Sequence, residues 1–134
     1  VGPAAGGPLA LWVGQRDDPV VVPQLVVGQA PVADLAGSLD LGRDAVEGFM
    51  GGTPEQIPEA YDDADPARRL PVKVPQLIVH GLRDDDVPFE GVAPYIAAAG
   101  DGIDTLIFED EGHYDVIDPA APSWEATLAY LAGI

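Results

Sequence analysis

The sequence predicts an α/β fold, with a sheet of three or four parallel strands and flanking helices. Two observations support this fold class. Short apolar runs alternate with segments of helical periodicity, as in proteins built around a parallel sheet. The apolar runs are also continuous, which is typical of strands that helices cover on both faces. The predicted strands are Gln24–Gln29, Gln76–His80 and Thr105–Glu109, each bounded by Pro, Gly or Asp.

Helices are expected between and after these strands, where apolar residues recur at helical spacing. They cover Leu9–Arg16, Asp44–Met50, Ile57–Tyr61, Val92–Ala99 and about Ser123–Leu131. The third helix is preceded by Thr53 and Gln56 at the spacing of a capping box, and the fourth is weakened by Pro94. The last helix is expected to bury three apolar residues: Trp124, Leu128 and Leu131.

A chain of 134 residues is the size of one domain. We therefore expect a single, partial domain over residues 1–134, with a small helical insertion at about 33–72. Hydrophobic residues make up 47% of the chain without a long apolar run, which indicates a soluble globular protein with no membrane span.

The chain is strongly acidic, with 23 Asp and Glu residues against six Lys and Arg, for a formal net charge of −17. This charge disfavours nucleic acid as a partner, because phosphates would be repelled. It also makes the compact state repel itself, so salt is expected to favour folding. A salt-rich habitat is one explanation of the composition, but we prefer the simpler one, an ordinary solvated acidic surface.

Cysteine is absent from the sequence, which excludes disulfides, thiolate metal sites and cysteine nucleophiles. The first residues lack both an initiator Met and the basic region of a secretory signal. A cytoplasmic location is therefore favoured, and the chain is expected to begin downstream of the translation start. Nothing in the sequence indicates a cofactor.

Two loops at the predicted carboxyl ends of strands carry residues with catalytic chemistry. Residues 80–88 hold three consecutive aspartates, Asp84, Asp85 and Asp86, and residues 109–115 hold His113. Loops of this kind lie at one edge of a parallel sheet, where ligands bind. If the two strands are neighbours, one aspartate can accept a hydrogen bond from one imidazole nitrogen and fix the tautomer of His113. The spacing alone leaves open which aspartate does so.

A metal site at the three aspartates is disfavoured. Three consecutive carboxylates cannot all point one way, and the spacing of a twelve-residue calcium loop is absent. The glycine-rich start of the chain is not a phosphate loop either, since it lacks the Gly-Lys-Ser/Thr ending. We therefore expect no metal.

The first twelve residues, VGPAAGGPLALW, resemble the nucleophile elbow and following helix of esterase-like and prolyl-oligopeptidase-like α/β-hydrolases, which typically read VGHSAGGHLALW. Gly2 and Gly6 match the elbow glycines, which let the backbone turn without a side-chain clash. Ala5 matches the residue whose amide supplies half of the oxyanion hole. The nucleophile position, a serine in the family, is Ala4 in this sequence.

The two catalytic loops resemble the same superfamily. His80-Gly81-x-x-Asp84-x-x-Val87-Pro88 is similar to its acid motif, so the resemblance assigns the triad acid to Asp84 rather than to the two neighbouring aspartates. Gly112-His113 is similar to the segment with the triad histidine. The resemblance implies the C-terminal half of an α/β-hydrolase fold, and a serine hydrolase site for a small-molecule ester or a peptide.

Ala4 departs from this pattern at the residue that matters most for the reaction. An alanine methyl cannot attack a carbonyl, so the chain as written is expected to be inactive as a serine hydrolase. Ser38 falls in the insertion and Ser123 at a helix start, so neither replaces the lost hydroxyl. Whether the chain is an enzyme therefore stays open. The alternative is a non-catalytic relative that binds a ligand or associates with itself through the old pocket.

The resemblance also bears on partners. A full α/β-hydrolase has strands before the elbow, whereas this chain starts at the elbow. An apolar sheet edge is therefore expected to be exposed, which favours pairing with another chain. A second copy in a homo-oligomer, or a complementing N-terminal half, would cover it.

Overall fold

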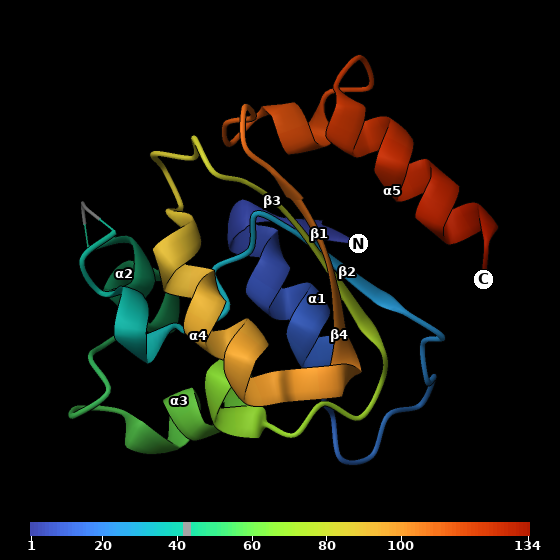
Figure 1. Cartoon of the computed structure of the whole chain (residues 1–134). Coiled ribbons are helices and arrows are strands. Elements are labelled where there is room, and N and C mark those ends of the chain that lie inside the picture. The colour runs from blue at the N-terminus through green and yellow to red at the C-terminus, as the bar shows by residue number, and fades with distance from the viewer. Residues whose placement is uncertain (42–43) are drawn as a thin grey trace.

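A computed structural model describes residues 1–41 and 44–134. Within these residues, four parallel strands form one sheet in the order β1-β2-β3-β4 (Figure 1). The strands are β1 Gly2–Pro3, β2 Val26–Gln29, β3 Gln76–Gly81 and β4 Ile103–Phe108. The sheet confirms the predicted α/β fold of three or four parallel strands. Because all four strands are parallel, the loops that follow them meet at one edge of the sheet.

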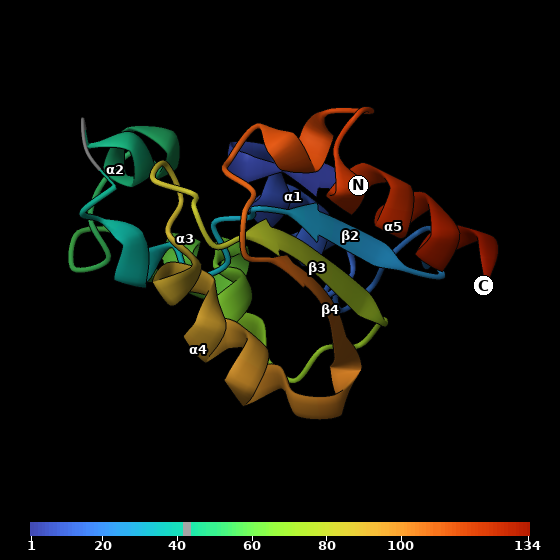
Figure 2. The same cartoon turned by 45° about the horizontal axis from the view of Figure 1, so that its top comes forward.

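Helices cover both faces of this sheet, as Figures 1 and 2 show. The α-helices of the described residues are α1 Gly7–Val13, α2 Ala45–Met50, α3 Pro58–Ala64, α4 Phe89–Ala99 and α5 Pro122–Ala132. On one face, Leu11 of α1 and Val92 of α4 pack with Ile78 of β3. On the other face, Leu131 of α5 packs against a cluster that includes Leu77. The alternation of β3 side chains therefore supplies both cores, and all six residues of β3 are buried.

The strand ends differ from the predicted ones by a few residues. β2 begins at Val26, opposite Gln76, because the residue that precedes β3 is Pro75, which has no N–H to continue the ladder. β4 begins at Ile103 rather than at Thr105, although Asp104 interrupts the apolar run. Asp104 is tolerated because β4 is an edge strand, and its carboxylate accepts a hydrogen bond from the Tyr130 hydroxyl at 2.6 Å.

Three helix predictions need correction. The helix α1 begins and ends earlier than expected, because it starts on the Gly7-Pro8 pair and stops at Gly14. The helix α4 is longer, since it starts at Phe89 and continues through Pro94. The capping-box bonds between Thr53 and Gln56 do form, at 3.0 and 3.3 Å, but they close a separate turn, and α3 starts only at Pro58.

The buried face of α5 also differs from the prediction. Leu128 is 53% exposed, so the expectation that it is buried was wrong. The buried positions are instead Ser123 and Thr127, one turn apart, and the Thr127 hydroxyl donates to the carbonyl of Ser123 at 2.7 Å. Small side chains at these positions let the helix lie close to the neighbouring segments, while Leu131 is partly buried against the second core.

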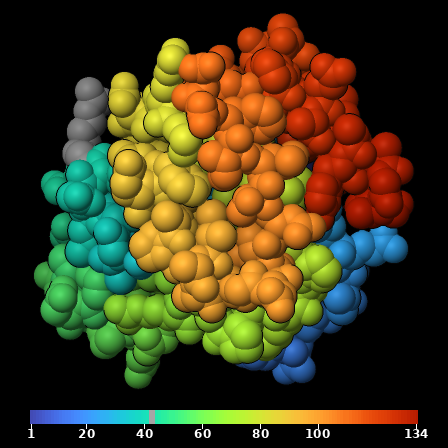
Figure 3. All heavy atoms as spheres, in the orientation of Figure 1, coloured from blue at the N-terminus to red at the C-terminus, as the bar shows by residue number. Residues whose placement is uncertain are grey.

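The segment between β2 and β3 carries α2 and α3 and packs on a third apolar cluster, which consists of Val32, Leu35, Val46, Tyr61 and Val87. A buried carboxylate, Asp65, joins the end of α3 to the first part of the same segment by accepting hydrogen bonds from the amides of Leu35 and Ala36 at 2.8 and 3.0 Å. Burial raises the pKa of Asp65 above its ordinary value, against the lowering effect of these amides. Figure 3 shows this segment gathered on one side of the molecule and α5 on the opposite side.

No helix in the described ranges, 1–41 and 44–134, combines the length and the apolar character that crossing a membrane requires.

Candidate active site

The turn after β1 has the strained backbone of a strand-to-helix elbow. Ala4 has a φ of +43°, which is uncommon for a residue with a side chain. A Cβ added to Gly2 would lie 2.3 Å from the carbonyl oxygen of Gly6, and one added to Gly7 would lie 2.3 Å from Cβ of Pro31. A Cβ at Gly6 would make only an ordinary 3.6 Å contact with Pro3. The steric need for glycine therefore falls on Gly2 and Gly7, and the expected need at Gly6 is not found.

The loop after β3 holds Asp84 as its buried member. Its Oδ1 accepts hydrogen bonds from the amides of Asp86 and Val87 at 2.9 and 2.7 Å. Its Oδ2 lies 2.7 Å from Nδ1 of His113, which follows β4. Asp85 and Asp86 are exposed. The structure therefore brings Asp84 and His113 together, and the buried carboxylate is the one that the acid motif assigns.

This contact fixes the tautomer of His113. An ionised carboxylate only accepts hydrogen bonds, so Nδ1 of His113 carries the proton and donates it toward Asp84. The other nitrogen, Nε2, then has a free lone pair. The His113 side chain is 12% exposed and Asp84 is fully buried, so this lone pair stands at the surface of the site while its orienting partner is shielded from water.

Two hydrogen bonds hold the loop that contains His113, one within the loop and one to a strand of the sheet. The amide of Gly112 donates to Asp115 Oδ2 at 2.6 Å, and Gln29 Nε2 donates to the carbonyl of Val116 at 2.8 Å. Gln29 belongs to β2 and is the register partner of Pro3, which immediately precedes Ala4. Through Gln29, the segment after His113 is thus connected to the strand that lies beside the elbow.

The loop after β3, residues 82–88, is called the acid loop, and the segment after β4, residues 109–117, is called the histidine loop. These two loops also contact each other directly. A Cβ added to Gly81 would lie 2.2 Å from the carbonyl oxygen of Glu111, so glycine is required at position 81. The same Glu111 carbonyl accepts a hydrogen bond from the amide of Arg83 at 2.9 Å, and the Glu111 carboxylate accepts one from the amide of Ser123.

The sequence analysis did not identify Gln29 and Glu111 as residues that support the site. A glutamine in an otherwise apolar strand was nevertheless a signal for a buried polar contact.

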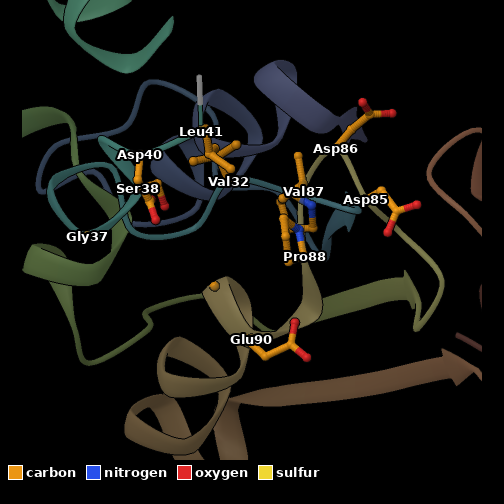
Figure 4. A pocket seen from close by; sticks show the side chains of 12 residues that line it. Val32, Gly37, Ser38, Asp40, Leu41, Asp85, Asp86, Val87, Pro88 and Glu90 are labelled. Carbon is orange, nitrogen blue, oxygen red and sulfur yellow. The ribbon is translucent and has the colours of Figure 1, made fainter. Parts of the chain in front are cut away.

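Two hollows adjoin the site. The larger one, about 560 Å³, lies between the segment after β2 and the acid loop, with Ser38 and Asp40 on one side and Val87 and Pro88 on the other (Figure 4). Its acidic lining residues are Asp40, Asp85, Asp86 and Glu90. The smaller one, about 90 Å³, is an apolar slot that includes Ala5. The two hollows adjoin because Val32 and Leu41 line both.

Neither of the two remaining serines lies at the elbow. Ser38 ends a single turn of 3-10 helix, Ala36–Ser38, in the segment after β2. Ser123 is buried in the first turn of α5, where its hydroxyl faces the carbonyl of Asp115 at 3.4 Å. The hydroxyl that the elbow lacks is therefore not supplied from these positions.

Asp84, Asp86 and His113 present ligand atoms within 4.8 Å of one another, which is close enough for a metal ion. Both oxygens of Asp84 already accept hydrogen bonds, one of them from His113. A cation in this place would have to displace the proton that joins His113 to Asp84. The hydrogen-bonded pair therefore accounts for the geometry without an ion.

Comparisons with known proteins agree on the fold. Esterase 2 of Thermogutta terrifontis superposes with a TM-score of 0.70 at 20% identity, over 98% of this chain and 51% of the esterase. A puromycin hydrolase gives 0.64 at 32% identity over 84% of this chain, and dipeptidyl peptidase 4 of Porphyromonas gingivalis gives 0.70 at 19% identity over 98%. The chain spans about half the length of the esterase and 18% of the length of each of the other two.

The similar solved structures also include a serine-to-alanine mutant of puromycin hydrolase in complex with PGG. A search of curated proteins finds no match. The sequence also matches the model of the prolyl oligopeptidase family, over residues 1–130. With its parallel sheet and elbow turn, the chain belongs to the prolyl oligopeptidase family of α/β-hydrolases.

Proposed function

We propose that this chain carries the acid–histidine part of a serine hydrolase site for carboxylic esters or peptides, and that it does not turn over substrate as written. The proposal is based on the 2.7 Å contact between His113 Nδ1 and Asp84 Oδ2, together with Ala4 at the strained elbow position. The match to a family of serine hydrolases supports the reaction class.

Each residue has a defined role in this proposal. Asp84 orients the imidazole of His113, whose Nε2 acts as the general base toward a hydroxyl at position 4 and later as the acid toward the leaving group. The amide of Ala5 donates to the developing oxyanion. Ala4 lacks the hydroxyl, and loss of a nucleophile lowers turnover by about a millionfold in a comparable triad.

The two hollows suggest the substrate class. The apolar slot of about 90 Å³ beside Ala5 suits a short apolar acyl group or side chain. The larger hollow is lined by four carboxylates, so it disfavours substrates with a negative charge near the scissile bond. Neutral or cationic esters and amides are therefore the proposed substrates, which is compatible with an esterase and a puromycin hydrolase among the structural neighbours.

The test is hydrolysis of a short-chain chromogenic ester, p-nitrophenyl butyrate, by the purified chain and its variants. We expect the chain as written to be near the rate without protein, and Ala4→Ser to exceed it by about a thousandfold or more. The double variant Ala4→Ser with His113→Ala should lose that gain. As a matched control, Ala98→Ser, which adds a hydroxyl at an exposed position of α4, should leave the rate of the chain as written unchanged.

Two results would contradict the proposal. Turnover by the chain as written that depends on His113 would mean that another group is the nucleophile. A properly folded Ala4→Ser variant with no activity would mean that Asp84, His113 and the amide of Ala5 do not suffice for hydrolysis.

A second proposed role, association without catalysis, has its own observation. Val1, Leu9 and Val13 beside β1 are 77%, 52% and 43% exposed, and in the described residues β1 has a strand neighbour on one side only. Self-association through this edge would cover the apolar surface. Light scattering during size-exclusion chromatography tests it, with Leu9→Glu expected to convert a dimer to a monomer. A monomer at all concentrations would refute this role.

A further inference from the structure

His80 is a completely buried histidine that the proposed reaction does not use. It is the fifth residue of β3, and none of its surface is exposed. Its Nε2 lies 2.8 Å from the carbonyl oxygen of Val87, at the far end of the acid loop. Its Nδ1 finds no hydrogen-bond partner in the described part of the chain.

These contacts define the tautomer of His80. A carbonyl oxygen only accepts, so Nε2 must carry the proton that faces Val87. Burial lowers the pKa of His80, which keeps the ring neutral near pH 7. The titratable groups around it are Asp84, His113 and Glu90, and burial outweighs the opposing attraction of the two carboxylates. Nδ1 is therefore an unprotonated acceptor without a donor.

An unpaired buried acceptor calls for a physical explanation. A leucine or phenylalanine at this position would fill the same space beside Phe89, whose ring meets the imidazole edge-on at 5.5 Å, without leaving a polar atom unpaired. The group that an apolar side chain could not supply is the Nε2–H donor. The bond to Val87 is thus the contribution that sets histidine apart at position 80.

Val87 links His80 to Asp84 through hydrogen bonds. Its carbonyl accepts from His80, while its own N–H donates to Asp84 Oδ1 at 2.7 Å. The N–H of Asp86 donates to the same oxygen at 2.9 Å. His80 is thus bonded to the same peptide segment whose amides occupy Oδ1. The other oxygen, Oδ2, lies 2.7 Å from His113 Nδ1 and 3.6 Å from His80 Nε2, beyond hydrogen-bond distance of the latter.

We propose that His80 is a positioning residue, whose Nε2–H bond to the Val87 carbonyl holds the acid loop so that Asp84 presents Oδ2 to His113. This inference rests on the proposed role of Asp84 and His113. It assigns to His80 no contact with the substrate and no proton transfer.

The experiment compares three substitutions in the chain as written, observed by NMR. Glutamine places an amide nitrogen at the position of Nε2, asparagine places it one bond short, and leucine offers no donor. Two signals report on positioning: the downfield Nδ1 proton of His113, and the exchange rates of the Asp86 and Val87 amide protons with solvent. Neither signal requires turnover.

We expect His80→Gln to keep the His113 proton signal and the slow amide exchange. In His80→Asn and His80→Leu the signal should be lost, and the exchange of the two amides should rise by about tenfold, equivalent to one net hydrogen bond. Val92→Ala, a core truncation in α4, is the control for lost stability: it should accelerate exchange throughout the chain yet keep the His113 signal.

The outcomes separate this inference from the proposed function. If the His113 signal is absent from the unsubstituted chain, the proposed pair itself fails. If it is present there and persists in His80→Leu, or is lost equally in Val92→Ala, the positioning role of His80 is overturned. Should His80→Leu not fold, the pair of amide variants decides, because equal behaviour of His80→Gln and His80→Asn would overturn the proposal as well.

Discussion

The two sides of the candidate site are built very differently. The acid–histidine side grows from β3 and β4, and β3 is six residues long, fully buried and paired on both edges. The nucleophile side grows from β1, which is two residues long and pairs with β2. On the first side Asp84 and His113 meet at 2.7 Å, whereas the second ends in a strained alanine. The proposed acid and base are therefore arranged by elements that do not include the proposed nucleophile position.

The largest expected effect tests whether the acid–histidine side is complete. In the Ala4→Ser background, Asp84→Asn should lower kcat by about ten-thousandfold, because an amide in place of the carboxylate favours the wrong tautomer of His113. Asp85→Asn is the matched control, since Asp85 is exposed and adjacent. Steady-state ester hydrolysis checks both, and a comparable loss in the Asp85 variant would contradict the assignment.

The next largest expected effect tests whether the acid–histidine side is more rigid than the nucleophile side. Gly81→Ala drives a Cβ to within 2.2 Å of the Glu111 carbonyl, and should cost about 1–3 kcal/mol of unfolding free energy. Gly2→Ala creates a similar overlap at 2.3 Å within the two-residue strand β1, which pairs with β2 alone in the described residues, so a smaller loss is expected.

Urea denaturation measures both losses. Gly48→Ala in α2 is the control: a Cβ there meets no atom of the described chain within 4 Å, and it should stabilise by about 0.5–1 kcal/mol. A larger loss for Gly2→Ala than for Gly81→Ala would reverse the comparison.

The smallest expected effect concerns pH. Because burial lowers the pKa of His80, the unfolded chain binds a proton below pH 6.5 that the folded chain does not bind. Stability should therefore fall as the pH drops from 6.5 to the lowered value of the folded state. His80→Gln should remove this part of the pH dependence in urea titrations at successive pH values, and an unchanged slope would show that His80 is not its source.

The sequence predicted the sheet and the meeting of an aspartate with His113 because both follow from local patterns. Continuous apolar runs mark the buried strands, and loops that follow parallel strands share an edge. The contacts that hold the site were not predictable in this way. Gln29 with Val116, and Gly81 with Glu111, join residues far apart in sequence, so no local spacing encodes them.

Local patterns also misled at particular residues. Apolar spacing placed Leu128 in the core, but the close approach of α5 is made by Ser123 and Thr127, whose small size rather than hydrophobicity fits the contact. Asp104 similarly concealed the first residues of β4, because a charged residue reads as a strand end unless the strand lies at an edge.

The hydrogen bond from Gln29 to Val116 has a consequence for protein engineering. It connects the histidine loop to β2 rather than to the elbow, so residue 4 can change without removing a contact that positions His113. Serine, threonine and cysteine could each be introduced at this one position while the acid and the base stay constant. Under the proposed roles of Asp84 and His113, the chain offers a setting in which the intrinsic reactivity of different nucleophiles can be compared beside one unchanged acid and base.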